Sequence, residues 1–212
     1  MARTTDEPSS AGGARSDRAA RVAAMQKAER ARAGRRRAAL IAVPTVVVLA
    51  VAGVVTAVFV NRPEPPSLDA VTTADYEASV HVTEPVTYEE TPPMGGPHYS
   101  VWLNCGIYDA PVPNENAVHS MEHGAVWITY RPDLPVEQVE ELKDAVSGQT
   151  YTVLSPYEGL PSPIVLSAWN NQLPVESADD PRIDAFLSKF VQGAQTPEPG
   201  ALCSNGVGTP TG

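Results

Sequence analysis

The pattern of hydrophobic and polar residues divides the chain into a polar, basic start, one long apolar stretch and a mixed remainder. The apolar stretch at 38–60, AALIAVPTVVVLAVAGVVTAVFV, contains 23 residues and no charged side chain. A helix of about 20 apolar residues crosses the hydrocarbon core of a bilayer, and membrane helices tolerate both proline and glycine. The pattern therefore predicts one transmembrane helix at 38–60, followed by a stiff, proline-rich linker at 61–70.

Beyond the linker, short patterns of both periodicities predict a mixed domain. Runs of β-branched and aromatic residues indicate strands near 80–86, 99–108, 125–130, 151–154 and 164–169. Apolar residues three and four positions apart indicate helices at 114–123, 136–146 and 180–191. We therefore expect an α+β domain at 71–203, a small mixed sheet with flanking helices, and a disordered tail at 204–212.

The helix expected at 114–123 has recognisable signals at both ends. Asn114 can cap its first turn, and Gly124 suits the left-handed position just after its last turn. The run AVWITY that follows at 125–130 is typical of a buried strand. The sequence therefore predicts that a short helix passes directly into a strand at Gly124.

The same helix carries the residues with the most chemistry. Spacings of three and four residues place His119, Glu122 and His123 on one face, whereas Val118 and Met121 lie on another. One face is then apolar and suited to the core. The other face gathers two imidazoles and a carboxylate within five residues.

Charge is distributed unevenly along the chain. The net charge is −10, but residues 1–37 hold ten of the fifteen basic side chains and only four of the 25 acidic ones. By the positive-inside rule, this basic and partly disordered tail lies in the cytoplasm, and the acidic domain at 71–203 lies outside a single-pass cell-membrane protein. The tail has no interleaved aromatic residues, so we expect the bilayer, and not nucleic acid, to be its partner.

Several motifs resemble one known family. The runs GGPH, HSMEHG, LSPYEGLP and LSAWNNQLPV, within a likeness that covers about 84–203, resemble domain-of-unknown-function family 3105, in particular its membrane-anchored actinobacterial members. The resemblance implies a common domain but supplies no reaction. The residues that match the family's motif are His98, Cys105, His119, Glu122, His123 and Cys203.

The chain contains two cysteines, Cys105 and Cys203. Both fall in the part expected outside the membrane, where disulfides persist, so we expect them to be paired. The alternative is that one or both are thiolate ligands of a metal. The absence of a CxxC spacing favours the disulfide.

Metal binding is the function that the helix face predicts. His119 and His123 can converge on one ion, with His98 as the expected third ligand and Glu122 or His81 as alternatives. Copper and zinc both suit such a ligand set. Met94, close to His98 in the sequence, would add a soft ligand for copper(I).

Three other interpretations of the cluster remain open. His-x-x-Glu-His is the spacing of inverted zinc peptidases, in which Glu122 would be the general base, and of S-ribosylhomocysteine lyase, which adds a cysteine ligand. The cluster can instead be structural, its histidines bonded to backbone carbonyl groups. The domain can also be a non-enzymatic docking module of another membrane complex.

Overall fold

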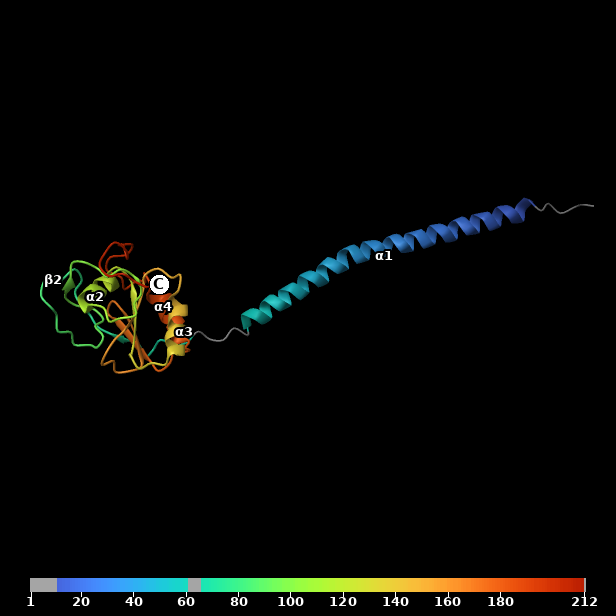
Figure 1. Cartoon of the computed structure of the whole chain (residues 1–212). Helices are drawn as coiled ribbons and strands as arrows, with labels where there is room; N and C mark the ends of the chain where they lie inside the picture. Colours follow the sequence, from blue (N-terminus) through green and yellow to red (C-terminus); the bar gives the residue numbers. More distant parts are fainter. Residues whose placement is uncertain (1–10, 61–65, 212) are drawn as a thin grey trace, which may run out of the picture. The chain divides into compact units, whose positions relative to one another are not determined.

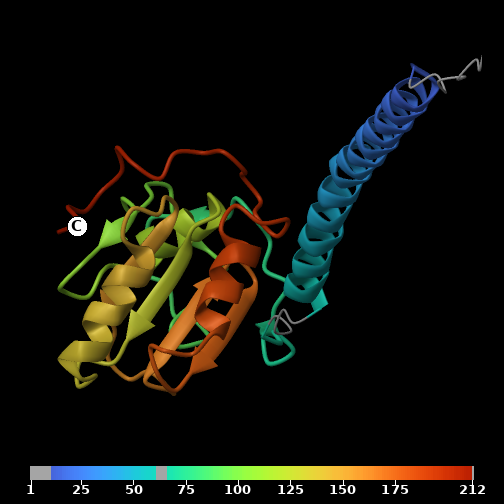
Figure 2. The same cartoon turned by 90° about the vertical axis from the view of Figure 1, so that its right-hand side faces the viewer.

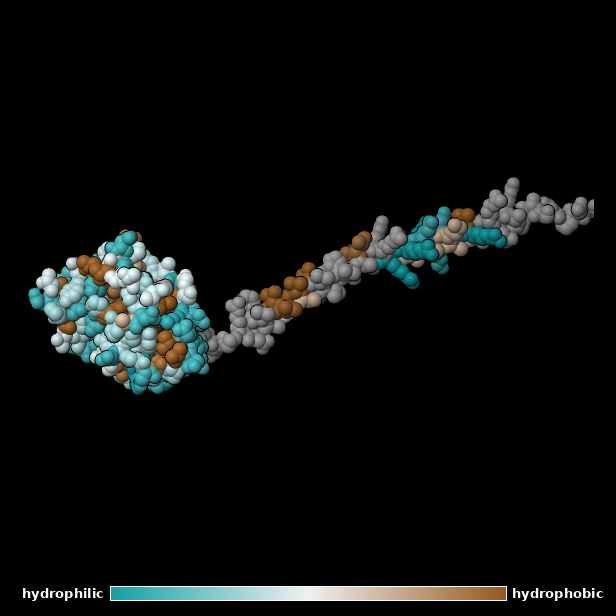
Figure 3. All heavy atoms as spheres, viewed as in Figure 1, coloured by the Kyte–Doolittle hydropathy of each residue, from teal (hydrophilic) through white to brown (hydrophobic). Residues whose placement is uncertain are grey.

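The computed structural model describes residues 11–60 and 66–211 of the chain (Figure 1). The chain divides between Glu64 and Pro65 into two compact units. The described part of the first unit is one continuous helix, α1 (Ala11–Val60). Among its coloured side chains, hydrophilic ones predominate in the first half and hydrophobic ones in the second (Figure 3). Sequence predictions for residues 1–10, 61–65 and 212 fall outside the described ranges.

The predicted transmembrane helix at 38–60 lies within α1. Among the residues that the structure describes, none of the helices has the length and apolar character that a membrane crossing requires. Within the predicted span, the side chains of residues 38, 39, 41–47 and 57–59 are outside the description.

The second unit is built around a six-stranded mixed sheet with the strand order β1-β8-β7-β5-β6-β4. Its strands are β1 (Thr72–Thr73), β4 (Gly106–Ile107), β5 (Val126–Tyr130), β6 (Thr152–Pro156), β7 (Ile164–Ala168) and β8 (Asn171–Val175). Strand β5 is parallel to β6 and antiparallel to β7. A separate parallel pair joins β2 (His81–Val82) to β3 (His98–Tyr99). The predicted α+β class and mixed sheet are confirmed.

Helices cover both faces of the larger sheet. Helices α3 (Val136–Val146) and α4 (Arg182–Phe190) pack over one face (Figure 2). Helix α2 (Asn114–Glu122) packs over the other, so side chains along β5 alternate between two cores. Val126 and Ile128 join the core under α3 and α4, whereas Trp127 joins the core under α2. This explains the continuous apolar run at 125–130, because a strand covered on both faces has no polar side.

Only the C-terminal end of α2 agrees with the sequence prediction. Gly124 has φ of +96°, in the left-handed region expected just after the helix. The prediction that Asn114 caps the helix is wrong, because the cap residue is Pro113 and no side-chain capping hydrogen bond is formed. The Asn114 amide donates to the Tyr157 hydroxyl instead, at 3.2 Å.

The strand predicted at 99–108 is also wrong. Strand β3 ends at Tyr99 and β4 begins at Gly106, and Leu103 between them forms only an isolated bridge with Val207. The backbone in this segment bonds to a helix and to the C-terminal segment rather than to one strand: Leu103 N–H donates to the Asn116 carbonyl group at 3.0 Å. An aromatic and β-branched run therefore serves here as a connecting segment.

Strand β8 was not expected from the sequence. Its sequence, NQLPV, begins with two polar residues and contains Pro174, and proline is unusual within a sheet. Its outer neighbour β1 pairs only with Asn171 and Gln172, so no strand pairs with Pro174 on that side. A proline is compatible with the strand for this reason.

The tail at 204–212 was predicted to be disordered, but its described residues 204–211 are bonded to the domain. Val207 N–H donates to the Trp102 carbonyl group at 2.9 Å, and Gly206 N–H donates to Oδ1 of Asn104 at 2.8 Å. Thr211 N–H reaches the carbonyl oxygen of Ile107 at 2.7 Å. Backbone pairing with distant residues, which composition does not reveal, orders this segment.

Candidate metal centre

The protein contains four histidines, and the fold gathers all four into one cluster. His119 lies on α2 and His123 immediately follows it, while β2 and β3 place His81 opposite His98. Neighbouring rings are close: their centroids are 4.9 Å apart for His98 and His119, and 4.5 Å for His119 and His123. Residues from three separate elements thus form one imidazole-rich site.

Glu122 lies within the cluster and is fully buried. Its Oε1 accepts a hydrogen bond from Ser79 N–H, and its Oε2 lies 2.9 Å from Nε2 of His98. Burial alone raises the pKa of Glu122, but the bonds from His98 and Ser79 together hold this pKa below its usual value. Glu122 is therefore an ionised carboxylate in a buried setting.

His98 is the buried side-chain partner of Glu122. Its Nδ1 lies 2.8 Å from the Gly96 carbonyl oxygen, which can only accept, so Nδ1 carries a proton. Its Nε2 shares a hydrogen bond with Oε2 of Glu122. Both ring nitrogens of His98 therefore have hydrogen-bond partners within the domain, and neither is turned towards a free site.

In His119 and His123, each Nδ1 also faces a backbone carbonyl group, but the two Nε2 atoms face each other. Nδ1 of His119 donates to the Tyr99 carbonyl oxygen at 2.6 Å, and Nδ1 of His123 donates to the Leu202 carbonyl oxygen at 2.7 Å. Burial lowers the pKa of His119 to about 4, so this ring is neutral at pH 7. Its unprotonated Nε2 faces Nε2 of His123 at only 2.9 Å.

The close nitrogen pair has the pattern of two metal ligands. Metal-binding histidines usually donate the other ring N–H to a carbonyl or carboxylate group, which fixes the ring and its tautomer. If each Nε2 bound an ion at roughly 2.0–2.1 Å, their separation of 2.9 Å would give an angle of about 90° at the metal. That angle is found in square-planar and octahedral sites, whereas a tetrahedral zinc site needs a separation of about 3.3 Å.

Two further residues of the site were missed by sequence reasoning. Oε2 of Glu198 lies 3.5 Å from Nε2 of His123, and the ring centroid of Trp102 lies 5.0 Å from that of His123. The predicted disulfide could have located both residues. Trp102 is three residues before Cys105 and Glu198 is five residues before Cys203, so pairing the cysteines brings both segments together.

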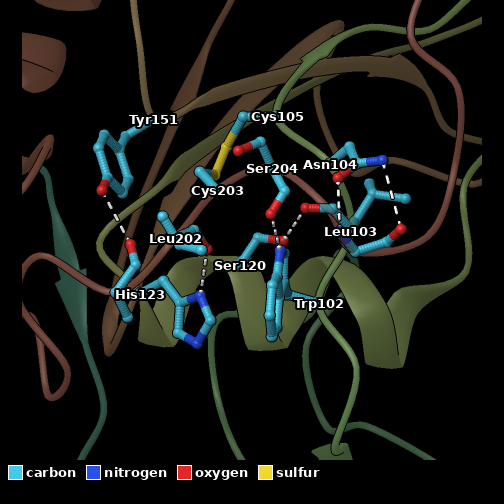
Figure 4. The surroundings of a disulfide bond; sticks show 12 residues. Trp102, Leu103, Asn104, Cys105, Ser120, His123, Tyr151, Leu202, Cys203 and Ser204 are labelled. Atoms are coloured by element: carbon cyan, nitrogen blue, oxygen red, sulfur yellow. Dashed lines mark hydrogen bonds between the residues drawn. A yellow bond between two sulfur atoms is a disulfide. The ribbon is translucent and has the colours of Figure 1, made fainter.

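The disulfide itself is present, as predicted. Cys105 and Cys203 are joined across a sequence separation of 98 residues (Figure 4). The bond holds the C-terminal segment against the chain that precedes α2. It thereby places the Leu202 carbonyl group beside the His123 ring.

The other predicted residues have definite places. His81 is the most exposed of the four histidines: its side chain is 39% exposed, and its Nε2 lies 3.7 Å from Oε2 of Glu122. Met121 and Val118 are fully buried in the core under α2, as the helical spacing predicts. Met94 is also buried.

Among the residues that the structure describes, two groups of side chains can each hold an ion. One comprises His119, His123 and Glu198, and the other comprises His81, His98, His119 and Glu122. Because Glu122 and His98 are already bonded to one another, the first group has the ligand atoms that are free. Fold and site together define a small α+β domain with a buried histidine–carboxylate centre.

Comparison with known proteins identifies the family. The chain belongs to the family described as protein of unknown function (DUF3105), which matches residues 80–205. The matched segment contains all four histidines and both cysteines. No curated protein and no solved structure matches the chain.

Proposed function

We propose that the domain binds one transition-metal ion, copper or zinc, between His119 and His123. The observation that supports this most strongly is the pair of Nε2 atoms 2.9 Å apart, with both Nδ1 atoms turned to backbone carbonyl groups. Without a cation or a shared proton between them, two lone pairs at this distance repel each other. A metal ion removes that repulsion.

Glu198 completes the proposed ligand set. Its carboxylate is 41% exposed and lies beside His123, so it can move onto an ion without breaking a buried contact. Two neutral imidazoles and one carboxylate suit copper(II) at the present angle of about 90°. Zinc suits the same ligands after the two rings separate by roughly 0.4 Å towards a tetrahedral angle.

Glu122 has a supporting role in this proposal. Both of its oxygens are occupied, by Ser79 and by His98, and its side chain is fully buried. A general base needs a free oxygen within reach of a water molecule. The geometry therefore favours metal binding over hydrolysis.

Metal content of the full-length protein tests the proposal. We expect about one bound copper or zinc per chain after loading and desalting, and loss of that metal in His119→Ala and His123→Ala. His81→Ala is the matched control, because it removes a histidine of the cluster and leaves the proposed ligands intact. Metal at 100 times its Kd should also stabilise the fold by about 2.7 kcal/mol.

Wild-type metal content in the His119→Ala protein would contradict the proposal. So would the absence of bound metal from every protein tested. In either case the cluster is structural, and a docking module of a membrane complex becomes the better hypothesis.

We further propose that 38–60 anchors the chain in the cell membrane, with the N-terminus in the cytoplasm and the domain outside. The support is the uncharged sequence of 23 residues, its basic flank, and exposed apolar side chains on α1. Those exposed side chains are Leu40, Val48, Leu49, Val51, Val54, Val55 and Val60.

Reporter fusions test this topology. A phosphatase that is active only outside the cytoplasm, fused after Pro66, should be active, and deletion of 38–60 should abolish that activity. A reporter that works only in the cytoplasm serves as the reciprocal control. Activity of the cytoplasmic reporter at Pro66 would show the opposite orientation or no insertion.

A further inference from the structure

The Cys105–Cys203 disulfide lies at the surface of the domain, in an open cleft. Both cysteines are half-buried, and the cleft beside them has a volume of about 310 Å³. It is lined by Cys105, Gln149, Thr150, Tyr151, Leu202, Cys203 and Ser204. A small thiol or the tip of a protein loop can therefore reach the sulfur atoms.

The chain just before Cys203 also supports the metal centre. The Leu202 carbonyl oxygen accepts the hydrogen bond from Nδ1 of His123 at 2.7 Å (Figure 4). Glu198 N–H donates to the Glu122 carbonyl oxygen at 3.1 Å, and its carboxylate lies beside His123. One short segment thus orients a proposed ligand, supplies another, and ends at the disulfide.

Two hydrogen bonds beside the cleft join the same segment to the rest of the domain. The Tyr151 hydroxyl donates to the Ala201 carbonyl oxygen at 2.8 Å, and Tyr151 lines the cleft. Cys105 N–H donates to the Cys203 carbonyl oxygen at 2.8 Å. A molecule that enters the cleft and opens the disulfide therefore acts on the residues next to Leu202.

We propose that the Cys105–Cys203 disulfide is a redox-active site for a dithiol, and that its reduction weakens metal binding at His119 and His123. The proposal rests on the metal-binding function proposed above. A thiolate of the dithiol attacks one sulfur, the S–S bond breaks, and a mixed disulfide forms. The second thiol then attacks the mixed disulfide, so the dithiol becomes a disulfide and two electrons and two protons pass to the two cysteines.

The coupling follows from what the covalent bond holds in place. Reduction leaves residues 198–203 held by hydrogen bonds alone, and the position of the Leu202 carbonyl group then varies more. His123 loses its fixed ring orientation and Glu198 its place beside it. Coupling between two sites in a protein typically changes affinity by roughly 5–150-fold, and the effect is reciprocal.

Metal titration of a cysteine-free protein is the first test. Full-length Cys105→Ser/Cys203→Ser should bind zinc and copper(II) about 5–150-fold more weakly than the oxidised wild type, within the typical range of coupling. Val146→Ala is the matched control, because it loosens the core on the other face of the sheet without touching the disulfide. Equal affinity in the oxidised wild type and the serine variant would overturn the proposal.

Reduction of the wild type is the second test, and it does not depend on the serine variant folding. Bound zinc should make the disulfide harder to reduce with a phosphine, which reduces disulfides without supplying a thiol ligand. In a redox buffer of a dithiol and its disulfide, where the reaction is reversible, the shift in the reduction equilibrium should match the change in zinc affinity. Equal reduction with and without zinc, in a protein that binds zinc, overturns this proposal alone. Failure of the oxidised wild type to bind zinc or copper overturns the metal function as well.

Discussion

Replacing Glu122 with alanine is expected to lower the free energy of unfolding by roughly 3–5 kcal/mol, the usual cost of removing one partner from a buried ion pair. The change leaves the fully buried His98 ring without its carboxylate partner. It also removes the acceptor of Ser79 N–H, and a hydrogen bond to a charged group contributes to stability in its own right. Both losses follow from removing one carboxylate group, and both lower the free energy of unfolding.

Urea denaturation followed by circular dichroism measures this change. Glu122→Gln should fall between the wild type and Glu122→Ala, because the amide oxygen still accepts a hydrogen bond but carries no charge. Glu137→Ala, an exposed glutamate in the first turn of α3, should stay within about 0.5 kcal/mol of the wild type. A similarly small loss for Glu122→Ala would show that His98 and Glu122 are not an ion pair.

Replacing Trp127 with alanine is expected to have an effect of similar size, roughly 3–5 kcal/mol. Trp127 is fully buried on the face of β5 that carries α2, and its Nε1 donates to Oγ of Ser155 at 3.0 Å. Alanine leaves a large cavity under the helix that carries His119, and leaves the Ser155 hydroxyl without its donor. If the proposed metal binding is correct, loss of stability should be accompanied by a lower metal affinity.

Urea unfolding measures this loss. A lower midpoint with an unchanged slope indicates lost packing, whereas a changed slope indicates that the compactness of the folded or unfolded state has changed. Trp127→Phe is the informative control, since it keeps most of the ring volume and removes only the N–H group. We expect it to cost less than half as much as alanine. Equal losses for the two variants would indicate that the hydrogen bond, rather than the packing, holds this core together.

Local patterns in the sequence identified the helix of the site and its surroundings. The spacing of His119, Glu122 and His123 placed them on one face, and Gly124 and the strand after it were recognisable from residue type alone. The same holds for α3, whose predicted bounds agree with the structure. These features depend on residues within one or two helical turns of each other, which is the range over which periodicity is informative.

The remainder of the site depends on contacts between distant residues. His81 and His98 meet through a parallel pair of two-residue strands, too short to leave a pattern in the sequence. The interpretation of His98 as a third ligand did not anticipate its pairing with Glu122, since proton positions depend on carbonyl groups such as that of Gly96. Of the features predicted from the sequence, only the disulfide connected residues of the site that are far apart in the chain.

The position of Leu202 and Glu198 in the sequence has a consequence for the order of events during synthesis. A growing chain that has emerged through Phe190 already contains every strand of the six-stranded sheet and helix α4. It does not yet contain the carbonyl group that orients His123 or the partner of Cys105. Because domains fold as their residues emerge, the sheet can form first, and the proposed metal site is complete only after the chain has extended past Cys203.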